Sequence, residues 1–333
     1  MKEHCTRNAR NGQSSRSSVE AQRILDRDIL PTLGAMRAEV INRGHVMEAI
    51  ERVADRGALR AADCALTLTR SIFNWACATG RLDRNPTLGL KKRNASKPRV
   101  RVLTPDEIRI FWHAIEGMPL VSASIRDALR LQLLTALRIN EVTEASRSEI
   151  DFEKKLWIVP AYRTKSEREH VLPLSDLALD LLRKIIARAD HEAERRARRH
   201  GVAFQEPDLL FPSRARINPM VGHAKKLKWQ RRVPGALDPH APPRCLIRCR
   251  EVLREKGIKQ PFNTHDLRRT VATHLGEMSV ADEIIERILN HAPRSIAGKH
   301  YVHARYLGSM RMALDHWGEK ITELIKTANT AVG

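Results

Sequence analysis

The sequence predicts a mainly α protein of the α+β class, with two domains and a small antiparallel sheet. Its 333 residues exceed the roughly 250 at which a single hydrophobic core stops growing, which favours two domains. Most segments have the apolar spacing of helices. Only two short runs, Leu156 to Pro160 and His170 to Pro173, have strand composition, and the polar turn between them predicts a hairpin.

Residues 1–17 and 18–90 differ in composition and in the spacing of their apolar residues. The first stretch is polar, is rich in Arg, Asn, Ser and Gly, and lacks periodicity, so we expect a disordered arm. The second predicts a small all-α domain, in which Pro31 ends the first helix and Gly80 follows the third, where a left-handed cap is expected. The predicted helices are Val19 to Leu30, His45 to Arg56 and Leu59 to Thr79.

A basic linker at residues 91–101 predicts the domain boundary, because it combines charge, small polar residues and a proline without apolar spacing. The second domain, 102–333, starts sharply: Thr104 can cap a helix, Pro105 suits its first position, and Glu107 completes a capping box. The predicted helices are 105–116, 124–137, a long helix capped by Ser175 that continues into 195–199, then 264–276, 281–289 and 305–326. Residues 212–261 give no clear pattern.

The charge of the chain indicates a polyanionic partner. Lys and Arg number 59 against 39 Asp and Glu, for a formal net charge of +20 and a pI of about 10.4. Cations that neutralise phosphates release counterions, so we expect nucleic acid. Charge alone leaves open a ribosomal protein, a membrane-surface protein or a basic soluble protein. Because no apolar run could span a bilayer and no secretory region is present, we expect a cytoplasmic, nucleoid-associated protein without membrane contact.

The cysteines predict neither disulfides nor a metal site. Cys245 and Cys249 lie four positions apart near His240, a grouping that raises the question of a metal. There is no second Cys/His pair at zinc-ligand spacing, so we expect reduced, unligated thiols. The five cysteines are Cys5, Cys64, Cys77, Cys245 and Cys249.

Arg138 follows an apolar helical run, and Glu141 comes three residues later. Two interpretations are open. The pair is either a local ion pair of small energy, or Glu141 orients the planar guanidinium of Arg138 so that it meets two oxygens of a phosphate.

His265 and Arg268 lie in the sequence Asn-Thr-His-Asp-Leu-Arg, in which Thr264 is a good N-cap. Their three-residue spacing places both on one face of a first helical turn. A phosphate at this helix N-terminus would meet free N–H groups, an imidazole and a guanidinium together. The alternative is an ordinary solvated helix face.

Lys165 lies in the polar turn between the predicted strands, where it is either a solvated charge or a group that reaches into a minor groove and protonates a leaving oxygen. His291 and Tyr301 are joined by a loop with little apolar content. The chain has only three tyrosines, and Tyr306 lies at the start of the terminal helix, where an aromatic ring is more typical of packing. A phenol, with a pKa of about 10, needs nearby cations and a base to act as a nucleophile.

Together these residues resemble the tyrosine recombinase (phage integrase) family, most closely the integrases of prophages and genomic islands. The resemblance runs from about residue 20 to the end of the chain. The family surrounds a scissile phosphate with two arginines, a lysine, two activating histidines and a nucleophilic tyrosine. The matching residues here are Arg138, Arg268, Lys165, His265, His291 and Tyr301, with Glu141 in support.

The resemblance implies a two-lobed clamp around double-stranded DNA, with a helical core-binding (SAM-like) domain at 18–90 and a mixed catalytic domain at 102–333. The enzyme would join attachment sites by two transesterifications through a 3′-phosphotyrosyl bond, and so integrate or excise a mobile element without metal, ATP or cofactor. The linker would contact DNA through Lys91, Lys92, Arg93, Lys97 and Arg99.

The family also implies a homotetramer on DNA, a monomer or weak oligomer when free, and an accessory protein that bends DNA or directs excision. The rival interpretations are a type IB topoisomerase-like enzyme, which religates the same strand, and an inactive DNA-binding remnant that represses. The terminal helix would pack on a neighbouring protomer, or alternatively on its own domain. Its apolar residues are Leu307, Met310, Leu314, Trp317, Ile321 and Leu324.

Two positions depart from the family pattern. Ala136 precedes the first arginine and Asn290 precedes His291, where many relatives have glycine. Asparagine tolerates the left-handed conformation, and we expect neither residue to abolish activity. An N-terminal β-rich module, which many island integrases use to hold arm-type sites, is also missing from the sequence. This fits a short recombinase without arm sites or a gene that has lost its start.

Overall fold

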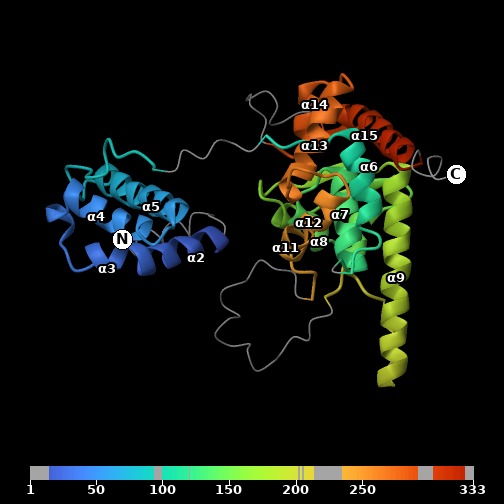
Figure 1. Ribbon diagram of the computed structural model, residues 1–333, viewed down its shortest axis with the longest axis horizontal. Helices are drawn as coiled ribbons and strands as arrows, with labels where there is room; N and C mark the ends of the chain where they lie inside the picture. Colours follow the sequence, from blue (N-terminus) through green and yellow to red (C-terminus); the bar gives the residue numbers. More distant parts are fainter. Residues whose placement is uncertain are drawn as a thin grey trace. The chain divides into compact units, whose positions relative to one another are not determined.

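The computed structural model describes residues 15–93, 100–119, 121–201, 203–204, 206–213, 235–291 and 303–326. These residues form two compact units, 15–93 and 100–326 (Figure 1). Each unit has its own cluster of buried apolar side chains. Within the described ranges, no helix combines the length and the apolar character needed to cross a membrane.

The first unit begins with a helix that widens before Pro31. Its segments are α2 (Ser15–Ile24), the π-helix η1 (Leu25–Ile29) and α3 (Leu30–Leu33). Proline cannot donate a hydrogen bond, and its ring crowds the carbonyl four residues earlier, so a wider turn before Pro31 relieves the conflict. The prediction that the helix ends at Pro31 is therefore wrong. The helix also begins earlier than predicted, so residues 15–17 of the expected disordered arm are helical.

Two further helices, α4 (Arg43–Ala54) and α5 (Leu59–Ala78), and a short 3-10 turn, η2 (Ala38–Val40), complete this unit. Asn42 caps α4 by accepting from the backbone N–H of His45 at 3.1 Å. Gly80 has a φ of +70°, so it supplies the predicted left-handed residue after α5. The apolar cluster between the helices includes Leu25, Ile29, Val46, Ile50, Leu66 and Phe73.

The second unit is mixed. Its sheet is antiparallel, in the order β1 (Ile150–Asp151), β2 (Leu156–Val159), β3 (His170–Pro173). The predicted hairpin is thus present, and β1 was missed because a two-residue strand carries no alternation. Its helices are α6 (Pro105–Ala114), α7 (Ala123–Thr135), α8 (Ile139–Thr143), α9 (Asp176–His200), α11 (Ala241–Arg248), α12 (Arg250–Glu255), α13 (Thr264–Glu277), α14 (Asp282–Ile288) and α15 (His303–Lys326), with 3-10 turns η3 (Arg147–Glu149) and η4 (Ala161–Arg163).

The start of α6 is the predicted capping box. The Glu107 N–H donates to Thr104 Oγ1 at 3.2 Å, and the Thr104 N–H donates to Glu107 Oε2 at 3.0 Å. α11 and α12 lie in the region 212–261, where the sequence predicted no elements. Both helices are short, and two prolines stand in the first turn of α11, so their periodicity is weak.

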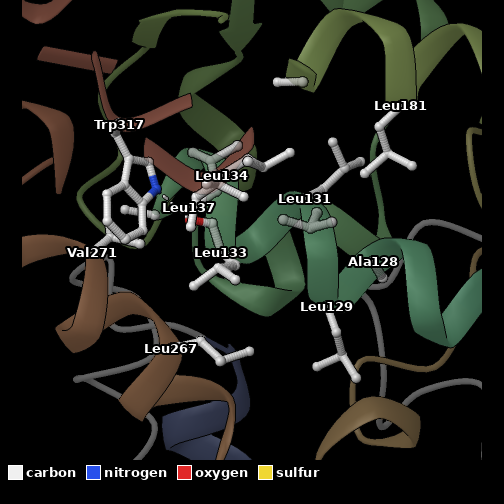
Figure 2. Packing of buried hydrophobic residues seen from close by; sticks show 14 of the residues in the cluster. Ala128, Leu129, Leu131, Leu133, Leu134, Leu137, Leu181, Leu267, Val271 and Trp317 are labelled. Atoms are coloured by element: carbon white, nitrogen blue, oxygen red, sulfur yellow. Dashed lines mark hydrogen bonds between the residues drawn. The ribbon is translucent and has the colours of Figure 1, made fainter. Parts of the chain in front are cut away.

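α7 is the centre of the core of the second unit (Figure 2). Leu129 and Leu133 point to one side of the helix and Leu131 to the other, yet all three are fully buried. Asp127 and Gln132 of the same helix are also buried, so α7 has cover on every side. Neighbouring helices supply it, with Leu181 from α9, Leu267 and Val271 from α13, and Trp317 from α15.

α15 packs in the core of its own unit. Trp317 is fully buried, and its Nε1 donates to the Leu133 carbonyl at 2.8 Å. Its ring stacks on His274 with centroids 5.6 Å apart. The other buried residues on this face are Met310, Leu314 and Ile321. The prediction that this face docks on a neighbouring protomer is therefore wrong, because the chain already covers it.

Ser175 occupies the N-cap position of α9, as predicted, but its hydroxyl makes no capping hydrogen bond. α15 approaches this residue closely. A Cβ added to Gly318 would lie 2.7 Å from both Cβ and Oγ of Ser175, so only glycine fits there.

Candidate active site

Arg138 lies at a sharp turn between two helices. Ala136 ends α7 with φ 55° and ψ 12°, a left-handed conformation that costs an L-residue about 1–2 kcal/mol. Arg138 then becomes the N-cap residue of α8, and the preceding helix has already ended at Thr135, two residues earlier than predicted. Ala136 is completely buried, whereas the Arg138 side chain is 28% exposed. The turn therefore brings a guanidinium from the core to an accessible surface.

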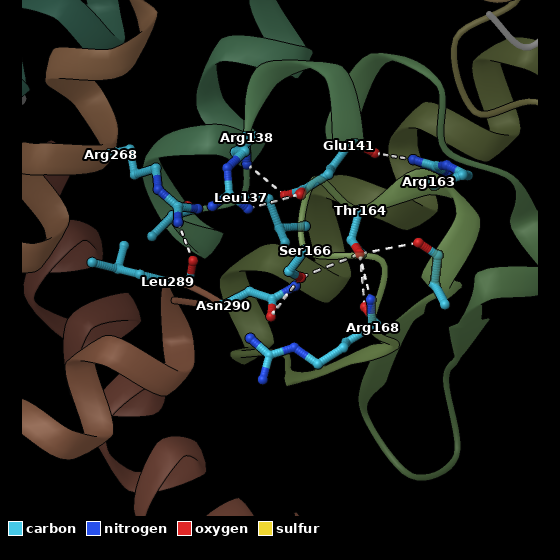
Figure 3. A network of polar contacts seen from close by, with 12 residues as sticks. Leu137, Arg138, Glu141, Arg163, Thr164, Ser166, Arg168, Arg268, Leu289 and Asn290 are labelled. Carbon is cyan, nitrogen blue, oxygen red and sulfur yellow. Dashed lines mark hydrogen bonds and ion pairs between the residues drawn. The ribbon is translucent and has the colours of Figure 1, made fainter. Parts of the chain in front are cut away.

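Glu141 holds Arg138 at two points (Figure 3). Its Oε2 accepts from the backbone N–H of Arg138 at 2.9 Å, and its Oε1 accepts from Nη1 at 3.1 Å. The carboxylate is only 2% exposed. Because one buried carboxylate fixes both the backbone and the side chain of Arg138, the geometry favours the interpretation that Glu141 orients the guanidinium.

Arg268 lies on α13 beside Arg138 (Figure 3). It is almost fully buried, and its guanidinium donates to the backbone carbonyls of Ala136 and Leu289. These carbonyls lie at the C-terminal ends of α7 and α14, where helices carry partial negative charge. Burial, and next the charge of Arg138, lower the pKa of Arg268 to about 10. Arg268 therefore stays charged at neutral pH.

The first turn of α13 positions His265. Its cap is Asn263 and not the predicted Thr264, which is the first helical residue. Asn263 Oδ1 accepts from the N–H groups of His265 at 2.8 Å and Asp266 at 3.1 Å. The sequence contained two adjacent residues able to cap, and the extended backbone of Asn263 decides between them.

The imidazole of His265 is exposed and lies in a positive field. Partial loss of solvent, and then the charges of Arg269, Arg268 and Arg138, hold its pKa below the ordinary value. The charges of Arg138 and Arg268 therefore act on His265, and these three predicted site residues lie close together.

The turn between β2 and β3 carries Lys165, whose side chain is exposed. Thr164 organises the turn: its Oγ1 donates to the Arg168 carbonyl at 2.7 Å and accepts from the Arg168 N–H at 3.1 Å. The turn is thus held by hydrogen bonds.

His291 follows the end of α14. The ring Nδ1 of His291 lies 2.6 Å from Glu286 Oε2, and the backbone N–H of His291 donates to the Glu286 carbonyl at 2.9 Å. Asn290, just before it, has a φ of 47°, the left-handed conformation that asparagine tolerates. Leu289 provides one of the two carbonyls that hold Arg268. The structure therefore places His291 two residues from an anchor of Arg268.

Tyr301 lies outside the described residues. Tyr306, near the start of α15, packs against the core, with the Arg287 guanidinium 3.8 Å from the centroid of its ring. This is the packing role expected of it. Tyr162 lies on η4 and is 75% exposed.

Arg163 is a member of the site that the sequence did not indicate. Its guanidinium forms a buried ion pair with Glu149 and also donates to the Glu141 carbonyl. Trp157 Nε1 donates to Glu149 Oε2 at 3.0 Å. The only sequence signal was an arginine two positions before Lys165, and nothing in the pattern pairs it with Glu149.

The predicted DNA-contacting linker is partly described. Lys91 and Lys92 are exposed. Arg93 is held by its own domain, since its N–H donates to Asp63 Oδ1 at 2.8 Å and its Nη2 lies 2.6 Å from Glu51 Oε1. Lys97 and Arg99 lie outside the described residues.

Cys245 and Cys249 are buried, with their sulfur atoms 3.9 Å apart. Burial, and next the neighbouring Cys249, raise the pKa of Cys245 to about 12, so it is a neutral thiol at physiological pH. In the part of the chain that the structure describes, no group of three or more His, Cys, Asp or Glu residues could hold a metal ion.

Comparison with known sequences identifies relatives along more than nine-tenths of the chain. The model of the phage integrase family matches residues 101–307, and that of the phage integrase central domain matches residues 1–93. Prophage integrase IntA of Escherichia coli (strain K12) is 26% identical over 92% of this chain, and the integrase of Shigella phage Sf6 is 25% identical over 93%. The chain spans 65% of the length of IntA and 71% of the Sf6 integrase.

Solved structures with a similar fold include a lambda integrase dimer bound to a COC′ core site, with a TM-score of 0.61, 17% identity and coverage of 91% of this chain and 94% of that one. The Tn1549 transposon integrase in complex with transposon right end DNA gives a TM-score of 0.60 and 16% identity, with 94% and 97% coverage. At these identities the likeness concerns the fold. The family match covers more than half of the chain and every predicted catalytic position, and the chain therefore belongs to the phage integrase family of tyrosine recombinases.

Proposed function

We propose that this protein is a site-specific tyrosine recombinase that integrates or excises a mobile element. The observation that carries the proposal is the pairing of Arg138 and Arg268, whose guanidinium groups lie side by side with His265 within their field. Two adjacent cations repel each other, so their arrangement is stabilised when an anion lies between them. A phosphodiester has the charge and the oxygen geometry that two guanidinium groups recognise.

The reaction is two transesterifications. The phenol oxygen of Tyr301 attacks the scissile phosphorus, a 3′-phosphotyrosyl bond forms, and the bond to the 5′-oxygen breaks with uptake of a proton by that oxygen. The freed 5′-hydroxyl of a partner strand then attacks the phosphotyrosine and releases Tyr301. One phosphoester replaces another at each step, so the bond energy is conserved and the reaction consumes no nucleotide.

Each cation has a distinct part in this proposal. Arg138 and Arg268 stabilise the charge that develops on the phosphorane oxygens. His265 and His291 activate the phosphate and the nucleophile. Lys165, exposed on an ordered turn, protonates the departing 5′-oxygen. The exposure of Lys165 supports this part, because its ammonium group must reach DNA from outside.

The substrate in this proposal is a pair of double-stranded DNA attachment sites. The helical domain 18–90, the linker 91–101 and the catalytic domain 102–333 all bind the duplex. A homotetramer assembles on two sites and an accessory protein sets direction. In support of the assembly, one lambda integrase structure of similar fold is a tetramer bound to a Holliday junction, with a TM-score of 0.59.

The test uses two labelled duplexes that carry the two ends of the resident mobile element. A recombinase converts them into recombinant duplexes with exchanged strands, and we expect Arg268→Ala to bind the same duplexes without producing them. Relaxation of a supercoiled plasmid without recombinants would instead indicate a topoisomerase-like enzyme. Binding without any cleavage would indicate an inactive remnant that represses.

A further inference from the structure

The turn that carries Lys165 is held on both sides by residues from other elements. Arg163 precedes Lys165 by two positions and Ser166 follows it directly. Arg163 ties the turn to α8 through the Glu141 carbonyl and to η3 through Glu149. Ser166 ties it to the end of α14, because its hydroxyl donates to Asn290 Oδ1 at 3.3 Å (Figure 3).

Asn290 is the residue through which the segment that carries His291 contacts the turn that carries Lys165. It directly follows Leu289, whose carbonyl accepts from Arg268, and directly precedes His291. Its backbone is left-handed, with φ 47°, which turns the chain out of α14. Its side chain then reaches the turn 124 residues away in sequence. Glycine would also adopt this backbone conformation, but glycine has no side chain that could contact Ser166.

The exposed side chain of Lys165 is not held by packing, so its position depends on how firmly the backbone of the turn is fixed. A lysine side chain has four rotatable bonds and loses up to about 2 kcal/mol of rotamer entropy when it is fixed. Restraining the backbone of its neighbour narrows the volume that the ammonium group samples. A general acid acts only from within hydrogen-bond reach of the oxygen that it protonates.

We propose that Asn290 is a positioning residue that holds the Lys165 turn against the His291 end of α14 through Ser166. Asn290 acts on the leaving group only by way of Lys165, and this inference rests on the proposed function. It assigns to Asn290 a task that a glycine at the same position could not perform.

The experiment measures cleavage rates under single-turnover conditions for Ser166→Ala, Asn290→Gly and the double variant. Two substrates are compared, one with oxygen and one with sulfur at the bridging 5′ position, since a sulfur leaving group hardly needs protonation. Ser166→Thr retains the hydroxyl. Two variants away from this contact serve as matched controls: Ser71→Ala removes an exposed serine of α5 in the helical unit, and Ser279→Gly replaces another left-handed residue, with φ 62°. Thermal melting confirms that each variant is folded.

We expect Ser166→Ala and Asn290→Gly each to slow cleavage of the oxygen substrate about fivefold, the effect of losing one hydrogen bond. The double variant should be no slower than either, because both changes remove the same hydrogen bond. Ser166→Thr and both controls should cleave at the wild-type rate. The sulfur substrate should restore the rate of all three slow variants.

The inference is overturned if the two single effects multiply in the double variant, if the sulfur substrate leaves the defects unchanged, or if neither variant is slow. These outcomes are distinct from failure of the proposed function, in which the wild type itself cleaves neither substrate.

Discussion

At the scale of single residues, Glu141 connects the candidate phosphate site to the protein interior. Its carboxylate accepts from both the backbone and the guanidinium of Arg138, and its own carbonyl accepts from Arg163. Removing its charge should therefore disturb catalysis more than binding, since Arg138 would remain cationic but lose its direction.

Glu141→Gln tests this. We expect cleavage to fall by about 10- to 100-fold, within the range for loss of one charge-assisted hydrogen bond in an active site, with little change in DNA affinity. Glu107→Gln is the matched control, because Glu107 closes an equivalent capping box on α6. Equal losses of cleavage in both variants would mean that Glu141 matters only as a helix cap.

The pKa of His265 provides a second test at this scale. Partial loss of solvent and then the neighbouring arginines lower it in the free protein. A bound phosphate would counter those charges and raise the pKa, so the complex would hold more protons than the free protein over the pH range in which His265 titrates. Affinity for DNA should therefore increase as the pH falls through this range.

The measurement is NMR titration of the His265 ring with and without a cognate duplex, together with the pH dependence of affinity. His265→Asn should remove the pH dependence assigned to this group. A His265 pKa that stays unchanged or falls on DNA binding would place the phosphate elsewhere.

At the scale of secondary-structure elements, the approach of α15 to α9 depends on one glycine. A Cβ at Gly318 would meet Ser175 at 2.7 Å, whereas a Cβ at Gly308 on the same helix would meet no atom within 4 Å. Gly318→Ala should destabilise the protein by about 1–3 kcal/mol because the helices must move apart. Gly308→Ala should stabilise it by up to about 1 kcal/mol, since alanine favours helix.

Urea unfolding of the two variants measures this difference. Similar free energies of unfolding for Gly318→Ala and the wild type would show that α15 can shift at little cost. The burial of Trp317 in the same helix argues against such freedom, because its indole nitrogen is fixed to the Leu133 carbonyl.

The elements also show which features the sequence could predict. Helices with clear caps, such as α6 at Thr104, and the β2–β3 hairpin were predictable because their signals are local. The partner of α15 was not, since an amphipathic face indicates only that something covers it. The cover comes from several elements of the same unit, among them α6, α7, α9, α14 and β3, and no local pattern in the sequence identifies them.

The residues of the candidate site also fall into those that the sequence could predict and those that it could not. Arg138, His265 and Arg268 were predictable because their residue types and order match a family pattern. Arg163 and the hydrogen bond of Ser166 with Asn290 were not, because each joins segments that are distant in sequence and follow no periodic pattern.

At the scale of the whole molecule, the net charge of +20 favours contact with DNA phosphates, and the structure distinguishes among the cations of the linker. Replacing Lys91 and Lys92 with alanine should reduce the slope of log K against log salt by about 0.9 for each phosphate that the protein no longer neutralises. Arg93→Ala should change it less, because Glu51 already neutralises Arg93.

Fluorescence anisotropy over a series of salt concentrations measures these slopes. An unchanged slope for the Lys91 and Lys92 double variant would remove this part of the linker from the interface. A larger effect from Arg93→Ala would show that DNA displaces Glu51.

The central claim is that the phosphate held by Arg138 and Arg268 is attacked by Tyr301. A nicked suicide substrate, which loses its 5′-hydroxyl fragment after cleavage, tests it most directly. The wild type should accumulate a covalent protein–DNA complex that survives detergent and disappears with protease. Tyr301→Phe should bind the substrate equally well and trap none, and Tyr306→Phe should still trap. A wild type that traps nothing, or a Tyr301→Phe variant that traps normally, would contradict the account.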